Sequence, residues 1–176
     1  GPLAGSNDLT QLTYHTPIDN VRDDFVFEFK RKKDASTFLT TSATVYNFWG
    51  YPTTLVDVDA TLTCLTFTAA RGVLDTRREM MVGQTACSSP NAADLVTTWT
   101  RDSALRLLQI TRADGSCLFY EYDSKGRLLR TKRRDDCNAA SAGDKQEYVY
   151  DQEGLVTEVQ TYDAANVLTA KQPFSY

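Results

Sequence analysis

Few residues in this chain of 176 have the types and spacing that catalysis or metal binding requires. The single histidine, His15, leaves little room for a catalytic triad or a histidine metal site. Asp57 and Asp59 flank Val58. In a strand both carboxylates would therefore project from one face, where they could pair for glycan hydrolysis or bind calcium. Exposed acidic residues opposite a core face explain them equally well. We therefore expect no catalytic residue, no metal site and no cofactor.

Aromatic residues give the best candidate for ligand binding. Residues 46–52 are the densest aromatic stretch and end in a Gly-Tyr-Pro turn that could expose some of the rings. Exposed rings could stack on sugars, and Trp99 could contribute to the same face. The alternative is that the rings fill the core, because buried aromatic side chains contribute large stabilising energies. The predicted ligand-binding residues are Tyr46, Trp49, Tyr51 and Trp99.

Five basic side chains gather between residues 127 and 134. On a strand, Arg130, Lys132 and Arg134 would share one face, and Arg127 and Arg133 would share the other. Such a patch could hold an anionic glycan or a phospholipid head group. More often a run of this kind is a charged edge strand that prevents sheets from aggregating.

The four cysteines indicate two disulfides rather than a zinc site. Cys64, Cys87, Cys117 and Cys137 are widely spaced, and close Cys-x-x-Cys pairs are absent. Three connectivities are possible. Two segments, however, share the order cysteine, strand, glycine turn, returning strand, cysteine, and this similarity favours Cys64–Cys87 and Cys117–Cys137. Each loop of about 20 residues would contribute on the order of 3 kcal/mol, and disulfides imply an oxidising compartment. The alternative is four free buried thiols in a cytosolic protein.

The composition and charge of the chain limit the classes of protein to which it can belong. The chain is 41% hydrophobic and 24% charged, with net charge −4, which is ordinary for a globular protein and argues against nucleic-acid binding. No apolar run approaches the roughly 20 residues of a transmembrane helix. We interpret residues 1–6 as a cloning scar and residues 7–24 as an N-terminal segment whose order the sequence leaves open. Residues 25–176 are predicted to form a single domain.

Alternation of apolar and polar residues with period two predicts strands through most of the chain, from 25–31 to 167–171. Short turns that begin with Asp and end with Gly or Asn separate many of them, so neighbouring strands must be antiparallel. A short helical turn is expected only at Ser89–Asp94. The sequence therefore predicts an all-β fold of about ten strands. It is an antiparallel meander of β-hairpins forming a curved sheet, open barrel or sandwich, with disulfides.

A repeated unit, Tyr-x-Tyr-Asp-x-x-Gly-x-Leu, occurs at residues 120–128 and, in weaker form, at 148–156 and 162–168. It resembles the YD repeats of the RHS and teneurin-like family over about residues 95–172. The resemblance implies β-hairpins whose tyrosines stack along one sheet face, and a scaffold without catalytic residues. In large relatives such hairpins spiral into a hollow shell, which this chain is too short to close.

These observations predict a non-catalytic β-module that binds a protein or glycan partner. We expect it to be secreted, periplasmic or on the outer surface of a bacterium, with no transmembrane span and with a lipid anchor conceivable upstream of residue 7. The alternative is a structural fragment of a larger YD-repeat shell or secretion assembly. A glycan hydrolase that uses Asp57 or Asp59 is the third hypothesis.

Overall fold

The computed structural model describes residues 10–14, 26–32, 38–69, 71–137 and 142–176. The chain divides into two compact units, residues 1–96 and 97–176, and each is described here by itself. The expectation of one domain over residues 25–176 stays a prediction.

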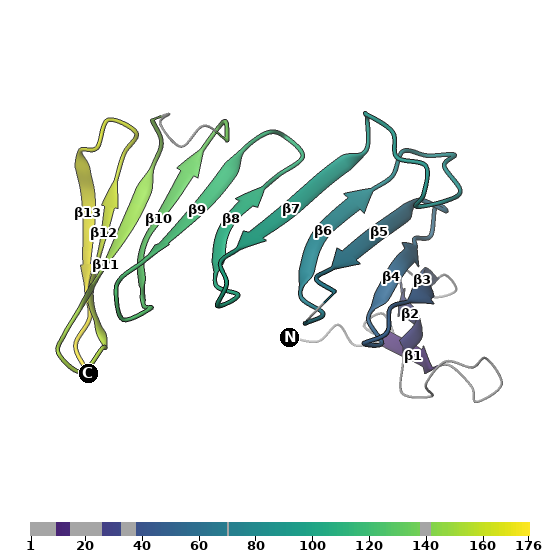
Figure 1. Ribbon diagram of the computed structural model, residues 1–176, viewed down its shortest axis with the longest axis horizontal. Coiled ribbons are helices and arrows are strands. Elements are labelled where there is room, and N and C mark those ends of the chain that lie inside the picture. The colour runs from purple at the N-terminus through teal and green to yellow at the C-terminus, as the bar shows by residue number, and fades with distance from the viewer. Residues whose placement is uncertain (1–9, 15–25, 33–37, 70, 138–141) are drawn as a thin grey trace. The chain divides into compact units, whose positions relative to one another are not determined.

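The N-terminal unit is an antiparallel meander in which each strand pairs with the next one in the sequence (Figure 1). Its strands are β1 (Thr10–Tyr14), β2 (Val26–Lys32), β3 (Phe38–Tyr46), β4 (Pro52–Val56), β5 (Leu62–Phe67) and β6 (Leu74–Glu79). A long connection follows β6 and carries Cys87, which is bonded to Cys64 on β5.

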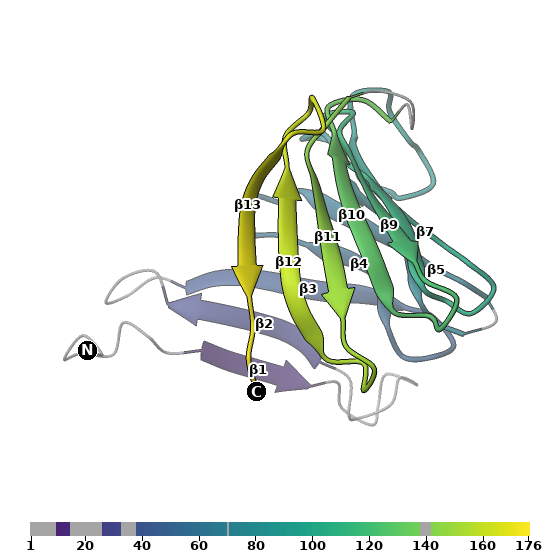
Figure 2. The ribbon, with the colours of Figure 1, turned by 90° about the vertical axis from the view of Figure 1, so that its left-hand side faces the viewer.

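The C-terminal unit continues the same plan, and its strands lie side by side in sequence order (Figure 2). Its strands are β7 (Leu95–Arg101), β8 (Leu107–Thr111), β9 (Cys117–Tyr122), β10 (Leu128–Arg134), β11 (Lys145–Tyr150), β12 (Val156–Tyr162) and β13 (Leu168–Pro173). Cys117 is bonded to Cys137, in the loop after β10. Both disulfides therefore have the expected pairing.

The all-β antiparallel meander is confirmed, but the number of strands and the short helical turn were predicted wrongly. The described residues hold thirteen strands rather than about ten, and β1 lies inside the segment 7–24. The alternation over residues 54–68 allowed one strand or two, and the structure has two, β4 and β5, with a turn at Asp57–Thr61 between them. Residues 89–94 form turns instead of a helix. Asp94 and Asn91 are joined by two hydrogen bonds: the Asp94 N–H donates to the Asn91 carbonyl, and the Asn91 N–H donates to Asp94 Oδ2.

Among the described residues, seven turns share one hydrogen-bond pattern that explains their sequences. In each, the N–H of the first residue donates to the carbonyl four residues on, over 2.9 to 3.0 Å, and the fourth residue has positive φ. Such a turn favours Asp first and Gly or Asn fourth. The turns begin at Asn47, Asp57, Asp102, Arg112, Asp123, Asp151 and Asp163. The fourth residues are Gly50, Ala60, Leu105, Gly115, Gly126, Gly154 and Asn166.

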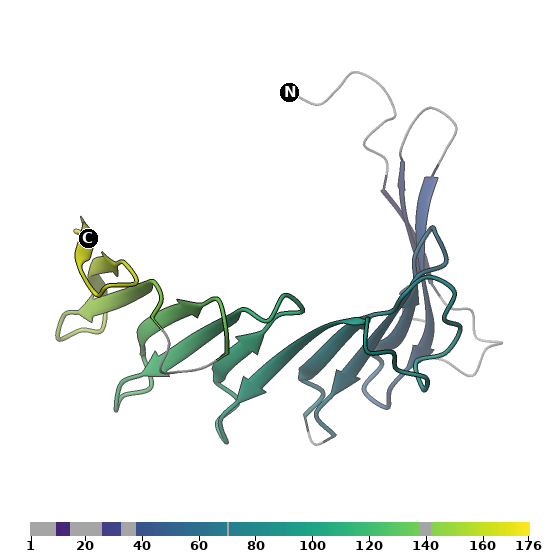
Figure 3. The same cartoon turned by 90° about the horizontal axis from the view of Figure 1, so that it is seen from above.

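Each unit is one layer of strands (Figure 3), so little is buried. The main cluster of buried apolar side chains joins Leu62, Cys64 and Met80, with Val56 and Cys87 packed against it. Most other strand side chains in the described residues are half-buried. A single layer of this kind relies on contacts between neighbouring hairpins more than on a shared core.

Candidate functional site

The tyrosines of the repeated unit lie on one face of the C-terminal unit, as the alternation predicted. Tyr120 is opposite Thr131, and Thr131 is opposite Gln146, two residues before Tyr148. Tyr122 and Tyr150 end β9 and β11, next to the turns that contain Asp123 and Asp151. These two end positions contact arginines of neighbouring hairpins.

Arg127 joins the β9–β10 turn to the end of β11. Its Nε donates to Asp123 Oδ2 over 2.7 Å, and its guanidinium lies 4.3 Å from the centre of the Tyr150 ring. The Tyr150 hydroxyl donates in turn to the carbonyl of Leu128, over 2.7 Å. One aspartate, one arginine and one tyrosine therefore connect three consecutive strands.

Arg106 repeats this arrangement one hairpin earlier. Its Nε donates to Asp102 Oδ2 over 2.7 Å, its guanidinium lies 4.8 Å from the Tyr122 ring centre, and the Tyr122 hydroxyl donates to Leu107. Sequence analysis missed this copy because Leu105 replaces the turn glycine. The shared signal was Asp-x-x-x-Arg-Leu, which occurs at 102–107 and at 123–128.

We refer to these two sets of contacts as the arginine–tyrosine ladder, which comprises Asp102, Arg106, Tyr122, Asp123, Arg127 and Tyr150. Glycine is favoured at position 126 for two reasons: its φ is +83°, and a Cβ there would lie 3.2 Å from Arg106 Nη1, which would have to shift. The backbone N–H of Arg127 lowers the pKa of Asp123; burial opposes this, and the guanidinium adds to it. The aspartate therefore stays charged and holds the arginine over the ring.

The ladder stops at the β11–β12 turn. There Asp151 still accepts the N–H of the residue four positions on, over 2.8 Å, but that residue is Leu155 rather than arginine. The next cation contact is of another kind, with Lys145 Nζ lying 4.2 Å from the centre of the Tyr162 ring.

Three of the five basic side chains of the cluster, Arg127, Arg130 and Lys132, form ion pairs with carboxylates of the C-terminal unit. Arg130 and Lys132 share a face, and Glu121 pairs with both. Glu147 pairs with Arg130 over 2.6 Å and with Lys145 over 3.0 Å. The interpretation of this run as an edge strand is wrong, because β10 lies between β9 and β11.

The aromatic stretch is more exposed than a core would be. Phe48 is 94% exposed, Trp49 49% and Tyr51 48%, and the Tyr51 ring stacks on Phe67 at a centroid distance of 5.4 Å. Tyr46 is half-buried, and burial raises its pKa. Trp99 belongs to the other unit, so a common platform with it stays a prediction.

The acidic pair does not form the same-face arrangement that hydrolysis or calcium binding would use. Asp57 and Asp59 lie in a turn, not a strand. Asp57 Oδ1 accepts the N–H of Val58 and the hydroxyl of Thr41, and Asp59 Oδ1 accepts the N–H of Thr61. Both carboxylates cap the turn. A strand prediction failed here because Ala60, with φ of +63°, takes the position that glycine fills elsewhere.

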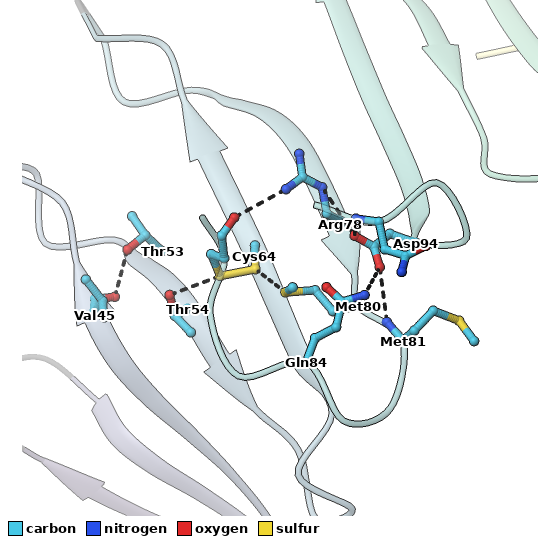
Figure 4. The surroundings of a disulfide bond; sticks show 11 residues. Val45, Thr53, Thr54, Cys64, Arg78, Met80, Met81, Gln84 and Asp94 are labelled. Carbon is cyan, nitrogen blue, oxygen red and sulfur yellow. Dashed lines mark hydrogen bonds and ion pairs between the residues drawn. A yellow bond between two sulfur atoms is a disulfide. The ribbon is translucent and has the colours of Figure 1, made fainter. Parts of the chain in front are cut away.

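The Cys64–Cys87 disulfide and a buried aspartate hold the connection after β6 over one face of the N-terminal unit (Figure 4). Asp94 accepts the N–H groups of Met81 and Asn91 and the side-chain amide of Gln84, over 2.8 to 3.1 Å. The Asn91 N–H is the main cause that lowers the pKa of Asp94; burial opposes it, and the charge of Arg78 contributes.

From the lowered pKa of Asp94 we expect the stability of the connection after β6 to depend on pH. Because its folded pKa lies below the unfolded value of about 3.9, Asp94 stabilises the fold fully above pH of about 4. That stability is lost as the pH falls through the folded pKa. We expect Asp94→Asn to be less stable than the wild type at pH 7 and to lose less stability on acidification. Urea unfolding at several pH values measures both; parallel pH profiles would contradict this role.

The described residues contain no group of three or more metal-ligating side chains and no helix long and apolar enough to cross a membrane. His15 lies outside the described residues.

No family model and no curated protein matches the chain. Several solved structures resemble it. The crystal structures of TcdB2-TccC3-Cdc42 and TcdB2-TccC3 match with TM-scores of 0.58 and 0.61 and identities of 18% and 20%. A structure of the Photorhabdus luminescens Tc holotoxin pore matches with a TM-score of 0.57 and 18% identity. The matches cover 81% to 83% of this chain.

This chain spans only 7% to 8% of the length of those chains. At such identities the likeness concerns the fold alone, and it is consistent with the YD-repeat-like hairpins that the Tyr-Asp motifs imply. By structure, the chain therefore has the antiparallel β-hairpin fold of a segment of the TcdB2-TccC3 chains.

Proposed function

We propose that this chain is a structural element of a larger assembly of YD-type hairpins. The arginine–tyrosine ladder is the observation that carries the proposal, because it ties two successive hairpins of the C-terminal unit to the strands that follow them through residues of the repeated motif. The fold likeness to segments of much longer chains supports the same function. The two disulfides are compatible with an extracellular protein. Secretion, a lipid anchor and a protein or glycan ligand stay predictions.

The outer edge of β13 is where such an assembly could continue. All six residues of β13 are exposed, and among the described strands it pairs only with β12. Phe174 donates its N–H to Thr157 over 2.9 Å. Because backbone groups alternate in direction along a strand, Gln172 also faces β12 and Lys171 faces away from it. Exposed edges of this kind readily pair with another strand.

The proposal predicts self-association through this edge. In sedimentation velocity, we expect the wild-type chain to associate as its concentration rises. Lys171→Pro should weaken association about tenfold, because it removes an outward N–H and leaves the bonds to β12 intact. Lys171→Ala is the matched control, since it removes only the exposed ion pair with Glu158. A wild-type chain that stays monomeric would count against the assembly role, and equal association of both variants would count against this edge.

A further inference from the structure

The β3–β4 turn differs from the other six turns of the same backbone geometry in the two residues at its tip. Phe48 and Trp49 stand there, and Phe48 is 94% exposed. The other tips hold Val58-Asp59, Ser103-Ala104, Ala113-Asp114, Ser124-Lys125, Gln152-Glu153 and Ala164-Ala165. Because the other six turns form without an aromatic residue at these positions, the fold does not require an aromatic pair at the seventh.

The neighbouring β5–β6 turn supports these rings. A Cβ at Gly72 would lie 2.9 Å from Tyr51 Cε2 and 3.1 Å from Trp49 Cγ, so both rings pack directly on the glycine. Phe48 meets Trp49 edge to face, with centroids 5.5 Å apart and planes at 82°. We refer to Phe48, Trp49 and Tyr51 as the aromatic tip. The Gly72 turn supports Trp49 and Tyr51, and Phe48 extends beyond them with its one ring contact to Trp49.

Most backbone N–H groups of this turn already have hydrogen-bond partners inside it. Four of the five backbone N–H groups of residues 47–51 donate within it: those of Asn47 and Gly50 to carbonyls, and those of Trp49 and Tyr51 to Asn47 Oδ1. A sugar needs hydrogen-bonding groups and a flat aromatic surface, and the crossed rings of Phe48 and Trp49 do not form one. A medium without hydrogen-bond partners fits better, since satisfied backbone groups enter hydrocarbon at the least cost.

The residues next to Phe48 are of the types found at the surface of a bilayer: amphipathic rings and a basic side chain. Trp49 and Tyr51 are half-exposed, and such amphipathic rings are enriched at the level of lipid head groups. Arg71 is exposed beside Gly72 and carries a charge that complements phosphate. We propose that the aromatic tip is a lipid-binding surface that inserts Phe48 among the acyl chains of a phospholipid bilayer, with Trp49 and Tyr51 at the head groups and Arg71 on a phosphate.

Vesicles of phosphatidylcholine and phosphatidylglycerol test this inference. In a Trp99→Phe background, where Trp49 is the sole tryptophan, we expect its emission to shift to the blue and its quenching by acrylamide to fall at about 1 mM lipid. Phe48→Ala should lower the partition coefficient by about tenfold or more. Val58→Ala is the matched control, because Val58 is 56% exposed at the same position of an identical turn, and it should bind like the parent.

Two results would overturn the inference: no change of Trp49 emission at that lipid concentration, or equal partition of Phe48→Ala and its parent. If Phe48→Ala abolishes self-association without any lipid binding, the aromatic tip is a protein contact instead. The inference does not depend on the assembly role, since a chain that binds vesicles as a monomer would support it and contradict the other.

Discussion

Replacing Cys64 and Cys87 with alanine is expected to lower the free energy of unfolding of the N-terminal unit by about 3 to 5 kcal/mol. The bond closes a loop with a sequence separation of 23, and Cys64, at 6% exposure, belongs to the main buried cluster. The substitution therefore relaxes the unfolded chain and also leaves a gap beside Leu62 and Met80. Urea unfolding followed by Trp49 emission, in a Trp99→Phe background, measures the loss.

The second disulfide is the matched control for this result. Cys117–Cys137 has a sequence separation of 20, so its chain-entropy contribution is similar. Cys117 is fully buried, but Cys137 is exposed and the bond lies in the other unit. Its removal should therefore leave the Trp49 transition unchanged. If removal of Cys64–Cys87 also left that transition in place, the bonds to Asp94 alone would be holding the connection after β6.

Local chemistry made the meander predictable. An aspartate that caps its own turn and a glycine that accepts positive φ each act within five residues, so the turns at Asp123 and Asp151 could be recognised without knowledge of the fold. The same logic was incomplete where a residue other than glycine or asparagine adopts positive φ. Ala60 hid the turn that begins at Asp57 and the capping role of this aspartate. Leu105 hid the geometry of the turn at Asp102, and with it the ladder role of Arg106.

Contacts between strands were harder to predict, because a run of charges looks the same at an edge and in the middle of a sheet. Arg130 is neutralised by glutamates on both neighbouring strands, which only the register reveals. For the rings at 46–52 the sequence left burial and exposure both open, and it did not single out Phe48 as the most exposed of them. Aromatic composition favours burial in a two-layer fold, but a single layer of strands provides no second face to bury these rings.

Arg127→Ala is expected to lower the free energy of unfolding of the C-terminal unit by about 1 to 2 kcal/mol. Most of that loss comes from the contact with the Tyr150 ring, because the partly exposed ion pair with Asp123 contributes little in water. Arg127→Lys should recover part of the loss, since lysine keeps the charge but not the planar donor group. Leu155→Ala changes the equivalent position of a turn outside the ladder and should cost less. Urea unfolding followed by Trp99 emission, in a Trp49→Phe background, compares the three variants.

A double-mutant cycle decides whether the arginine and the tyrosine act together. If the ladder joins neighbouring hairpins, Arg127→Ala and Tyr150→Ala should be coupled by about 1 kcal/mol, because either substitution alone breaks the same contact. The pair Arg106 and Tyr122 should show similar coupling at the previous hairpin. The coupling between Arg127 and Tyr122 should be smaller, because Tyr122 contacts Arg106 and Arg127 contacts Tyr150. If the losses were additive both for Arg127 with Tyr150 and for Arg106 with Tyr122, the arginines would only stabilise their own turns. Neighbouring hairpins would then be held together by the backbone hydrogen bonds of the sheet.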